Sequence, residues 1–322
     1  MRTDRMKLII QIPCLNEADQ IAETLVTIPR DFDGVDVTEI MIVDDGSTDD
    51  TVAVALAAGA HHVHSNPTNL GLARTYVIGL EQALLRGADL IVNMDADNQY
   101  PARFIQPLID PILAGRAELT VGARPIDRIA HFSPLKRRLQ RFGSWVVRRA
   151  SGLNVPDAPS GFRAVSRSAA MRLYTFSSYS YTIETLIQAG RINIPIASVP
   201  IETNPPTRPS RLMRSMLNYI LKSMATILRI GMLYYPFRVF FWTAIVVATP
   251  GILAILRFVL LYLSGDGEGR LQSLVLGSAL FATGAVLMIG GVLADLIAAN
   301  RMLLQDLRAR ALEEKLAREA RK

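Results

Sequence analysis

The stretch DLIVNMDADNQ, residues 89–99, decides the fold class of this chain of 322 residues. The run LIVNM before Asp95 is typical of a strand buried in a parallel sheet. It ends in two carboxylates one residue apart, Asp95 and Asp97. Carboxylates at the end of a rigid strand suit Mg²⁺ or Mn²⁺, which takes its remaining ligands from water and substrate phosphates. An isolated Asp-x-Asp is also a common polar turn, so the surrounding sequence has to decide between the two interpretations.

Composition points to a membrane rather than to nucleic acid. Half of the residues are apolar (50%) and the mean hydropathy is +0.25, which is high for a wholly soluble protein. The formal charge of +6 fits an anionic membrane surface, and no nucleic-acid motif accompanies the basic residues. Cys14 is the single cysteine, so an intrachain disulfide is excluded. The apolar run after Lys7 is too short for a secretory signal, so we expect the N-terminal part in the cytoplasm.

Residues 7–123 alternate apolar runs with helical patterns, as in LIIQI and EIMIV. This alternation predicts an α/β fold with a Rossmann-like, mostly parallel sheet, whose ligands gather at the carboxyl ends of the strands. Polar residues follow three of the predicted strands, with Glu17 after the first, Asp45 after the second, and Asp95 with Asp97 after a later one. Carboxylates that converge on one edge repel each other unless a cation or a hydrogen-bond donor lies between them. The pattern therefore predicts a nucleotide and metal site.

Four motifs follow one another along the first part of the chain: PCLNE at residues 13–17, VDDGSTDDT at 43–51, the loop at 66–71 and DADNQ at 95–99. In this order they resemble the nucleotide-sugar-binding signature of family 2 glycosyltransferases, which have a GT-A fold. The resemblance covers roughly the first 125 residues. It implies that the donor is bound by Pro13, Leu15, Glu17, Val43, Asp45, Asp95, Ala96 and Asp97. It also implies a Mg²⁺ or Mn²⁺ ion held by Asp95, Asp97 and Gln99.

Three further motifs follow: PLKRR at residues 134–138, DAPSGFR at 157–163 and YTIE at 181–184. They narrow the resemblance to polyisoprenyl-phosphate glycosyltransferases of the dolichyl-phosphate mannose synthase type. The family moves one sugar from a nucleotide to a lipid phosphate, and the resemblance implies that Arg124 and Arg137 touch the acceptor or donor phosphates. It also implies a site-closing role for Arg208 and Arg211 in TRPSRL. The chain departs from the pattern at Arg141, where the family often has serine.

The chemistry of a lipid phosphate agrees with this resemblance. A phosphate monoester has a second pKa near about 6 and is already largely dianionic in the cytoplasm, so its attack needs no general base. In-line attack on the anomeric carbon inverts its configuration. Asp157 could instead serve as the base for a hydroxyl acceptor, or it could cap a turn. The basic residues at 134–149 form either an anion site or a solvated helix face.

The C-terminal third predicts a membrane anchor. Two apolar segments, residues 237–263 and 271–298, exceed the length of about 20 residues that spans a bilayer. The short connection makes them a hairpin of two transmembrane helices, and arginines crowd their other ends at Arg229, Arg238, Arg301, Arg308 and Arg310. This charge asymmetry places both chain termini in the cytoplasm. A stripe of small residues at Gly277, Gly284 and Gly291 predicts close packing against the first span or a neighbouring subunit, as in a homo-oligomer.

We therefore expect four parts: a cytoplasmic GT-A domain at residues 1–210, interfacial amphipathic helices at 211–236, two spans at 237–299 and a charged C-terminal helix at 300–322. The interfacial segment could also be a core-facing helix, and the C-terminal helix could be simply solvated. The expected function is transfer of one sugar to polyprenyl phosphate at the inner membrane, which makes a lipid-linked donor for cell-envelope glycans. The alternatives are another membrane acceptor or a catalytically inactive, tethered nucleotide-sugar sensor. A processive polysaccharide synthase is disfavoured. Resemblance to that family would require a Gln-x-x-Arg-Trp motif and more spans, and neither tryptophan of this chain follows an arginine.

Overall fold

The protein consists of two compact units, which we call the α/β unit (residues 1–220 and 307–322) and the hairpin unit (residues 221–306). The computed structural model describes residues 5–125, 144–145, 148, 152–153, 155–175, 181–204, 229, 232, 234–265 and 271–319. The segment at 211–236, expected to lie at the membrane interface, is largely outside the described residues.

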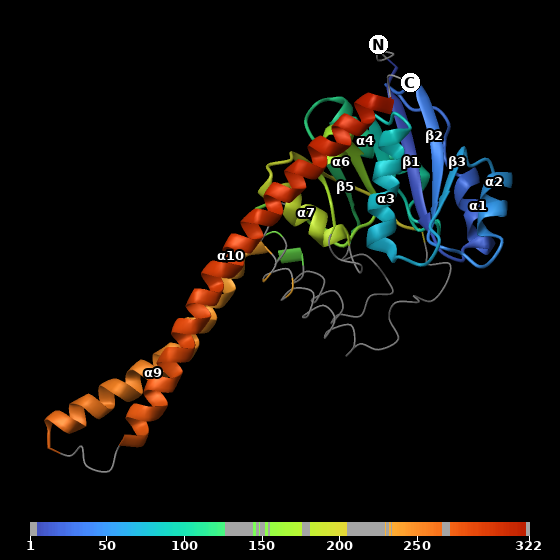
Figure 1. Ribbon diagram of the computed structural model, residues 1–322. Helices are drawn as coiled ribbons and strands as arrows, with labels where there is room; N and C mark the ends of the chain where they lie inside the picture. Colours follow the sequence, from blue (N-terminus) through green and yellow to red (C-terminus); the bar gives the residue numbers. More distant parts are fainter. Residues whose placement is uncertain are drawn as a thin grey trace. The chain divides into compact units, whose positions relative to one another are not determined.

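A mixed sheet forms the centre of the α/β unit (Figure 1). Within the described residues its strands are β1 (Lys7–Cys14), β2 (Val37–Asp44), β3 (His62–Ser65), β4 (Leu90–Asn93), β5 (Leu119–Ala123), β6 (Arg163–Ser166) and β7 (Ile196–Pro200). They follow the order β3-β2-β1-β4-β6-β5-β7. All neighbours are parallel except β6, which runs antiparallel to β4 and β5. The predicted α/β fold with a mostly parallel sheet is confirmed.

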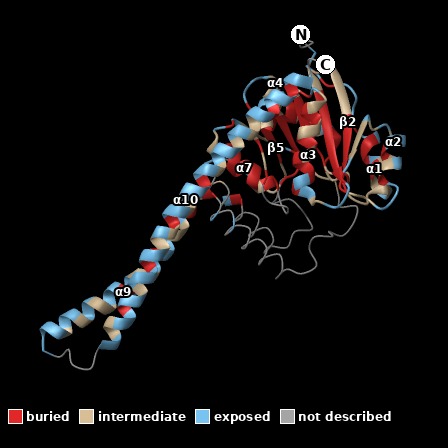
Figure 2. Ribbon diagram, viewed as in Figure 1, coloured by how far each residue is buried: buried red, intermediate tan, exposed pale blue. Residues whose placement is uncertain are grey.

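Helices cover both faces of the sheet. They are α1 (Ala18–Val26), α2 (Thr51–Ala57), α3 (Leu72–Leu85), α4 (Ile105–Leu113), α6 (Arg167–Arg172) and α7 (Tyr181–Arg191), with a short 3-10 turn η1 (Ala102–Phe104) before α4. Because side chains alternate along a strand, Ile10 and Ile12 of β1 join a core cluster with residues of α1 and α4. Gln11 points to the other face, where its Nε2 donates to Tyr76 O of α3 at 3.4 Å. Figure 2 shows the buried sheet between these layers.

The strand register brings the polar strand ends to one edge. Cys14 of β1 pairs with Asp44 of β2, and Gln11 of β1 pairs with Asn93 of β4. The residues that follow these three strands therefore emerge at the same edge, which we call the carboxyl edge. This arrangement is the one expected from the alternating pattern, and it places the segment at residues 95–99 beside those at 13–17 and 43–47.

Strand β6 lies between β4 and β5 and is the one strand that reverses direction in the described sheet. It begins at Arg163, the last residue of the DAPSGFR motif, and its sequence RAVS is too short and too polar to predict a central strand. The reversal matters for the site, because it carries the loop before β6 to the carboxyl edge. Gly122 N of β5 donates to Phe162 O at 2.9 Å and fixes this loop to the end of β5.

The hairpin unit contains α9 (Pro236–Leu263) and most of α10 (Leu271–Glu319), two helices long and apolar enough to cross a membrane. Most of their large apolar side chains are exposed, unlike those of a core helix in a soluble protein. The predicted glycine stripe lies against α9: a Cβ added at Gly284 would be 2.7 Å from Ala248 Cβ, and one added at Gly277 would be 2.8 Å from Gly251 O. Of the two expected partners for the stripe, the structure shows the first span.

Helix α10 continues without interruption past residue 300, and its last turns belong to the α/β unit. Leu312 and Leu316 are buried there. Glu81 of α3 faces two cations of α10, with Arg308 Nη2 at 3.5 Å and Lys315 Nζ at 3.7 Å from its carboxylate oxygens. The charged C-terminal helix is therefore not simply solvated; its residues 307–319 pack on α3 (Figure 1).

This packing predicts that Leu312→Asp destabilises the protein. Leu312 is 6% exposed and Leu307 is 60% exposed on the same helix, so Leu307→Asp is a matched control. Burying a carboxylate in place of a packed leucine costs several kcal/mol, whereas the exposed site tolerates the change. We expect the thermal unfolding midpoint of the full chain in detergent to fall by more than about 5 °C for Leu312→Asp alone. Equal midpoints for the two variants would contradict the packed arrangement.

Candidate active site

The carboxylate pair Asp95 and Asp97 lies in a turn directly after β4. Ala96, between them, is buried, and its carbonyl oxygen accepts a hydrogen bond from Thr24 Oγ1 of α1 at 2.8 Å. Gln99 N donates to Asp97 Oδ1 at 3.1 Å, which closes the turn. The buried strand and the bond from α1 thus fix the backbone on which both carboxylates are carried.

Negative charge is crowded at this turn. Burial, reinforced by the negative charge of Asp97, raises the pKa of Asp95 to about 7, although Arg124 acts in the opposite direction. Glu17, at the end of β1, adds a smaller contribution of the same sign as Asp97. Charges that follow β1 (Glu17) and β5 (Arg124) thus act on the carboxylate after β4. Asp45, which was expected to converge on the same place, is not among the groups that shift this pKa.

The donor set fits Mg²⁺ or Mn²⁺. Two carboxylates one residue apart supply hard oxygen ligands, and their mutual repulsion favours a divalent cation between them. Among the described residues, no group of three or more His, Cys, Asp or Glu side chains is placed to hold a metal. A metal bound at Asp95 and Asp97 would therefore complete its coordination with water, Gln99 or the diphosphate of a ligand.

Arg124 is held next to this pair by a buried partner. It follows β5, and its Nε and Nη2 donate to Asp157 Oδ2 and Oδ1 at 2.6 and 3.0 Å. Asp157 is fully buried, and Arg124 is 15% exposed. Burial opposes the charge of the guanidinium, but Tyr100 and Asp157 raise the pKa of Arg124 above its usual value. Asp157 therefore serves as the counter-ion of Arg124, and neither the base nor the turn-cap interpretation anticipated this pair.

The loop that carries Asp157 is itself fixed by a buried arginine. Arg163, at the start of β6, is fully buried, and its Nε and Nη2 donate to Ser160 O at 2.8 Å and Ala158 O at 2.9 Å. Its Nη1 donates to Thr185 Oγ1 of α7 at 2.7 Å. These bonds connect the DAPSGFR motif to α7. Arg163 therefore holds the loop at residues 157–161 in place near the carboxylate turn.

Asp45 is bonded to the loop at residues 66–71. Its Oδ1 accepts from Asn66 Nδ2 at 3.0 Å and Leu70 N at 2.9 Å, and its Oδ2 accepts from Gly71 N at 2.9 Å. Asp45 is 4% exposed. The nucleotide contact expected of Asp45 stays a prediction; the observed bonds show that its carboxylate shapes the loop that leads into α3.

The remaining predicted donor-binding residues differ in their exposure. Val43 is fully buried, and its Cγ2 lies beside Gly79 of α3, so its side chain belongs to the core rather than to an open pocket. Pro13 is also buried, whereas Leu15 and Glu17 are partly exposed at the end of β1. Of these four side chains, Leu15 and Glu17 are therefore the ones accessible to a ligand, and their contact with a base or ribose stays a prediction.

Three predicted arginines lie outside the described residues: Arg137, expected at a phosphate, and Arg208 and Arg211, expected to close the site. Their roles stay predictions from the sequence.

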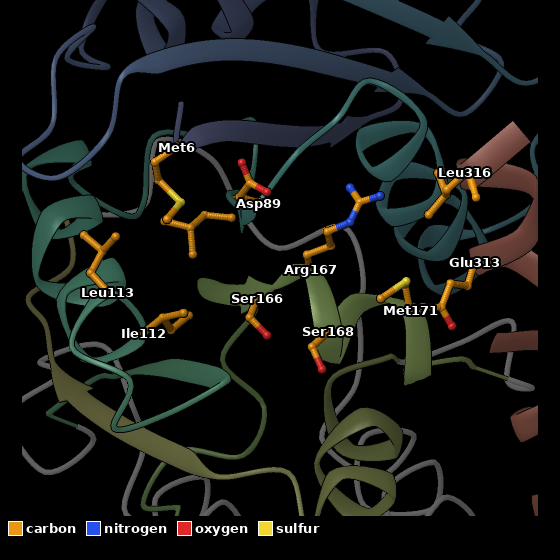
Figure 3. A pocket seen from close by; sticks show the side chains of 12 residues that line it. Met6, Asp89, Ile112, Leu113, Ser166, Arg167, Ser168, Met171, Glu313 and Leu316 are labelled. Atoms are coloured by element: carbon orange, nitrogen blue, oxygen red, sulfur yellow. The ribbon is translucent and has the colours of Figure 1, made fainter. Parts of the chain in front are cut away.

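A cavity of about 600 Å³ lies elsewhere in the α/β unit (Figure 3). Met6, Asp89, Ser166, Met171 and Leu316 are among the residues that line it. Asp89 precedes β4 and Ser166 ends the antiparallel β6, so the cavity is at the sheet edge opposite Asp95. It is separate from the carboxylate turn and does not contribute to the candidate active site.

A mostly parallel α/β sheet with a carboxylate pair after β4 and further polar residues at neighbouring strand ends is the arrangement of a GT-A-type glycosyltransferase. The chain belongs to glycosyl transferase family 2, because the family model of that description matches residues 9–174, just over half of the chain. The resemblance inferred from the sequence motifs is confirmed, and the protein is a glycosyltransferase.

Two relatives share slightly more than a quarter of the aligned residues with this chain. An undecaprenyl-phosphate mannosyltransferase of Micrococcus luteus is 28% identical over 206 residues, which cover 61% of this chain and 83% of the relative. A polyprenol monophosphomannose synthase of Mycolicibacterium smegmatis is 26% identical over 206 residues, covering 61% and 76%.

A solved structure of similar fold is glucosyl-3-phosphoglycerate synthase from Mycobacterium tuberculosis in complex with Mn²⁺, uridine diphosphate and glucosyl-3-phosphoglycerate. It is 25% identical, with a TM-score of 0.53, and the match covers 70% of this chain and 80% of that chain. The GT-A-like fold expected from the sequence is thus confirmed.

The buried pair predicts strong coupling between Arg124 and Asp157. Breaking a buried ion pair from either side costs about 3 to 5 kcal/mol, because the remaining charge is left unpaired. In a double-mutant cycle of Arg124→Met and Asp157→Asn, we expect a coupling free energy of unfolding above about 1.5 kcal/mol. The exposed pair Arg103 and Glu202, at 2.6 Å, is the control, and its coupling should stay below about 1 kcal/mol. Similar coupling in both cycles would contradict the proposed counter-ion role.

Proposed function

We propose that the protein transfers a single sugar from a nucleotide sugar, a UDP- or GDP-hexose, to polyprenyl phosphate, with inversion at the anomeric carbon. The product would be a lipid-linked sugar donor for cell-envelope glycans. The observation that carries the proposal is that one chain joins the carboxylate pair after β4 to two exposed apolar helices long enough to cross a membrane. The names of the Micrococcus luteus and Mycolicibacterium smegmatis relatives, which include polyprenyl-type phosphates, support the same acceptor class.

In this proposal Asp95 and Asp97, with Gln99, hold a Mg²⁺ or Mn²⁺ ion, which would neutralise the diphosphate of the departing nucleotide. The crystallisation of a structural neighbour with Mn²⁺ and uridine diphosphate supports this choice of cofactor. Leu15 and Glu17 would contact the base and ribose from the end of β1. Asp45 would keep the loop at residues 66–71 in position beside the nucleotide, in addition to any direct contact.

Arg124 would bind phosphate oxygens on the other side of the carboxylate turn. Asp157 occupies its Nε and Nη2 edge and fixes the guanidinium, so phosphate binding would need little further ordering of this side chain. Asp157 is fully buried in this pair, which disfavours it as a general base. A dianionic phosphate acceptor needs no such base, so the arrangement agrees with a lipid phosphate better than with a sugar hydroxyl.

We propose further that α9 and α10 anchor the protein in the inner membrane, with both termini in the cytoplasm. Arg238 at the start of α9 and Arg301 of α10 lie at the same end of the hairpin, where Arg301 stacks on Tyr234 at 4.9 Å from the ring centroid. Arginines at this end favour the cytoplasmic side, and tyrosines are common at either membrane interface. A homo-oligomer through the exposed faces of the hairpin stays a prediction.

A water-soluble phosphorylated acceptor is a second candidate, favoured by the structural neighbour that is described with glucosyl-3-phosphoglycerate and phosphoglyceric acid. A transfer assay separates the two. Purified full-length protein is incubated with labelled UDP- or GDP-sugars and with either polyprenyl phosphate or phosphoglyceric acid, and the label is partitioned between organic solvent and water. We expect label in the organic phase with the lipid. Transfer to phosphoglyceric acid alone would overturn the proposal, and the anomeric configuration of the product is read by NMR.

Asp97→Ala should abolish most of this transfer without unfolding the protein. Loss of a ligand to the metal removes several kcal/mol of stabilisation from the leaving diphosphate, so we expect turnover to fall at least about 100-fold. Asp31→Ala is the control, because Asp31 is exposed on the loop before the amino end of β2. The thermal midpoint of each variant is measured in parallel. Full activity of the wild-type protein in excess chelator would show that no metal is needed.

A further inference from the structure

Asn93 joins three segments directly behind the carboxylate turn. It is 1% exposed and lies two residues before Asp95 at the end of β4. Its Nδ2 donates to Gly161 O and to Tyr181 Oη, both at 2.9 Å, and its Oδ1 accepts from Gln11 Nε2 at 3.0 Å. Both ends of this buried amide are therefore used, and the loop before β6 is fixed to the strand that carries Asp95.

Gly161 has no side chain, and the space that a side chain would need there is filled by atoms of Tyr181 and Asp95. A Cβ added there would lie 2.8 Å from Tyr181 Oη and 3.3 and 3.4 Å from the two carboxylate oxygens of Asp95. Gly161 does not have a positive φ, so the backbone itself would accept an alanine. The requirement for glycine at this position is therefore one of room, and the atoms that need the room belong to Asp95 and Tyr181.

Tyr181 cannot easily move away. Its ring is 1% exposed and stacks on Tyr76 with centroids 4.0 Å apart and an interplanar angle of 12°. The guanidinium of Arg163 lies 5.8 Å from the centre of the same ring. A methyl group at residue 161 would therefore meet a fixed phenol on one side and the carboxylate of Asp95, at the end of a strand, on the other.

We infer that Gly161, Tyr181 and Asn93 are positioning residues that set the orientation of the Asp95 carboxylate. The loop that contains Gly161 also contains Asp157, the partner of Arg124, so one buried loop orients the anionic and the cationic side of the site. The inference rests on the proposed role of Asp95 as a metal ligand, and it assigns the geometry of that ligand to residues distant in the sequence.

The test measures Mn²⁺ affinity rather than turnover. Full-length protein in detergent is titrated with Mn²⁺ at saturating uridine diphosphate, and bound metal is followed by electron paramagnetic resonance. Because changes in residues that orient a metal ligand weaken binding by about 10- to 100-fold, we expect Gly161→Ala to weaken Mn²⁺ binding at least tenfold. Gly284→Ala is the matched control, since its Cβ would also meet an atom closely, at 2.7 Å, but that atom belongs to Ala248 in the hairpin unit. It should lower the thermal midpoint and leave Mn²⁺ affinity within about twofold.

A second variant tests the contact itself. Tyr181→Phe removes the oxygen that lies closest to a Cβ at residue 161, so in the Gly161→Ala background it gives the new methyl group room to move away from Asp95. We expect the double variant to bind Mn²⁺ more tightly than Gly161→Ala alone, even though Tyr181→Phe alone weakens binding by loss of its bond to Asn93. Losses that simply add would overturn the proposed geometry.

The outcomes separate this inference from the proposed function. If the wild-type protein and Gly161→Ala bind Mn²⁺ equally well, Gly161, Tyr181 and Asn93 do not position Asp95, and the proposed function is unaffected. If the wild-type protein binds no Mn²⁺ in the presence of uridine diphosphate, the metal role of Asp95 fails and the inference fails with it. Weaker binding in Gly161→Ala at an unchanged thermal midpoint supports the inference most directly.

Discussion

Repulsion between carboxylates is the interaction on which the active site depends. Asp95 and Asp97 share a turn, and the negative charge of Glu17 also acts on Asp95. Burial strengthens the charge interactions at this turn. The positive charge of Arg124 offsets part of this repulsion. Arg124 is held by a fully buried Asp157, and that aspartate is carried by a loop that the buried Arg163 secures. This arrangement of charges suits the proposed ligands, a divalent cation and the phosphate groups of a nucleotide sugar.

The features that depend on residues close together in the chain were predicted from the sequence. The run LIVNM predicted a buried strand because its apolar residues are consecutive, and the carboxylates after it emerge where a parallel strand must end. Alternating strands and helices predicted the sheet, and the order of four motifs identified the family. The two apolar segments also coincide with α9 and the first part of α10. Each of these features depends on residues that are close together in the chain.

Features that depend on distant residues were not predictable in this way. Arg124 and Asp157 are 33 positions apart, and nothing in either segment indicates the pair. The reversal of β6 places a loop from residues 157–161 behind Asp95, whereas the mostly parallel sheet predicted from the sequence did not indicate which strand reverses. Asp45 fitted a nucleotide contact by resemblance, yet its oxygens are used by backbone and side-chain donors of the loop at residues 66–71. Val43 fitted the pocket by motif, but alternation along β2 turns it into the core.

The return of α10 to the α/β unit has a consequence for biosynthesis. Residues 1–220 leave the ribosome first, and residues 221–306 follow before the helix turns that cover α3 exist. At roughly 5 to 20 residues per second, this interval lasts on the order of ten seconds, during which part of an apolar surface stays uncovered. With the two proposed membrane crossings, the last turns reach α3 only when the hairpin has been inserted with both ends on the same side. Completion of the enzyme would then report correct membrane insertion, so a wrongly inserted chain would remain open to proteolysis.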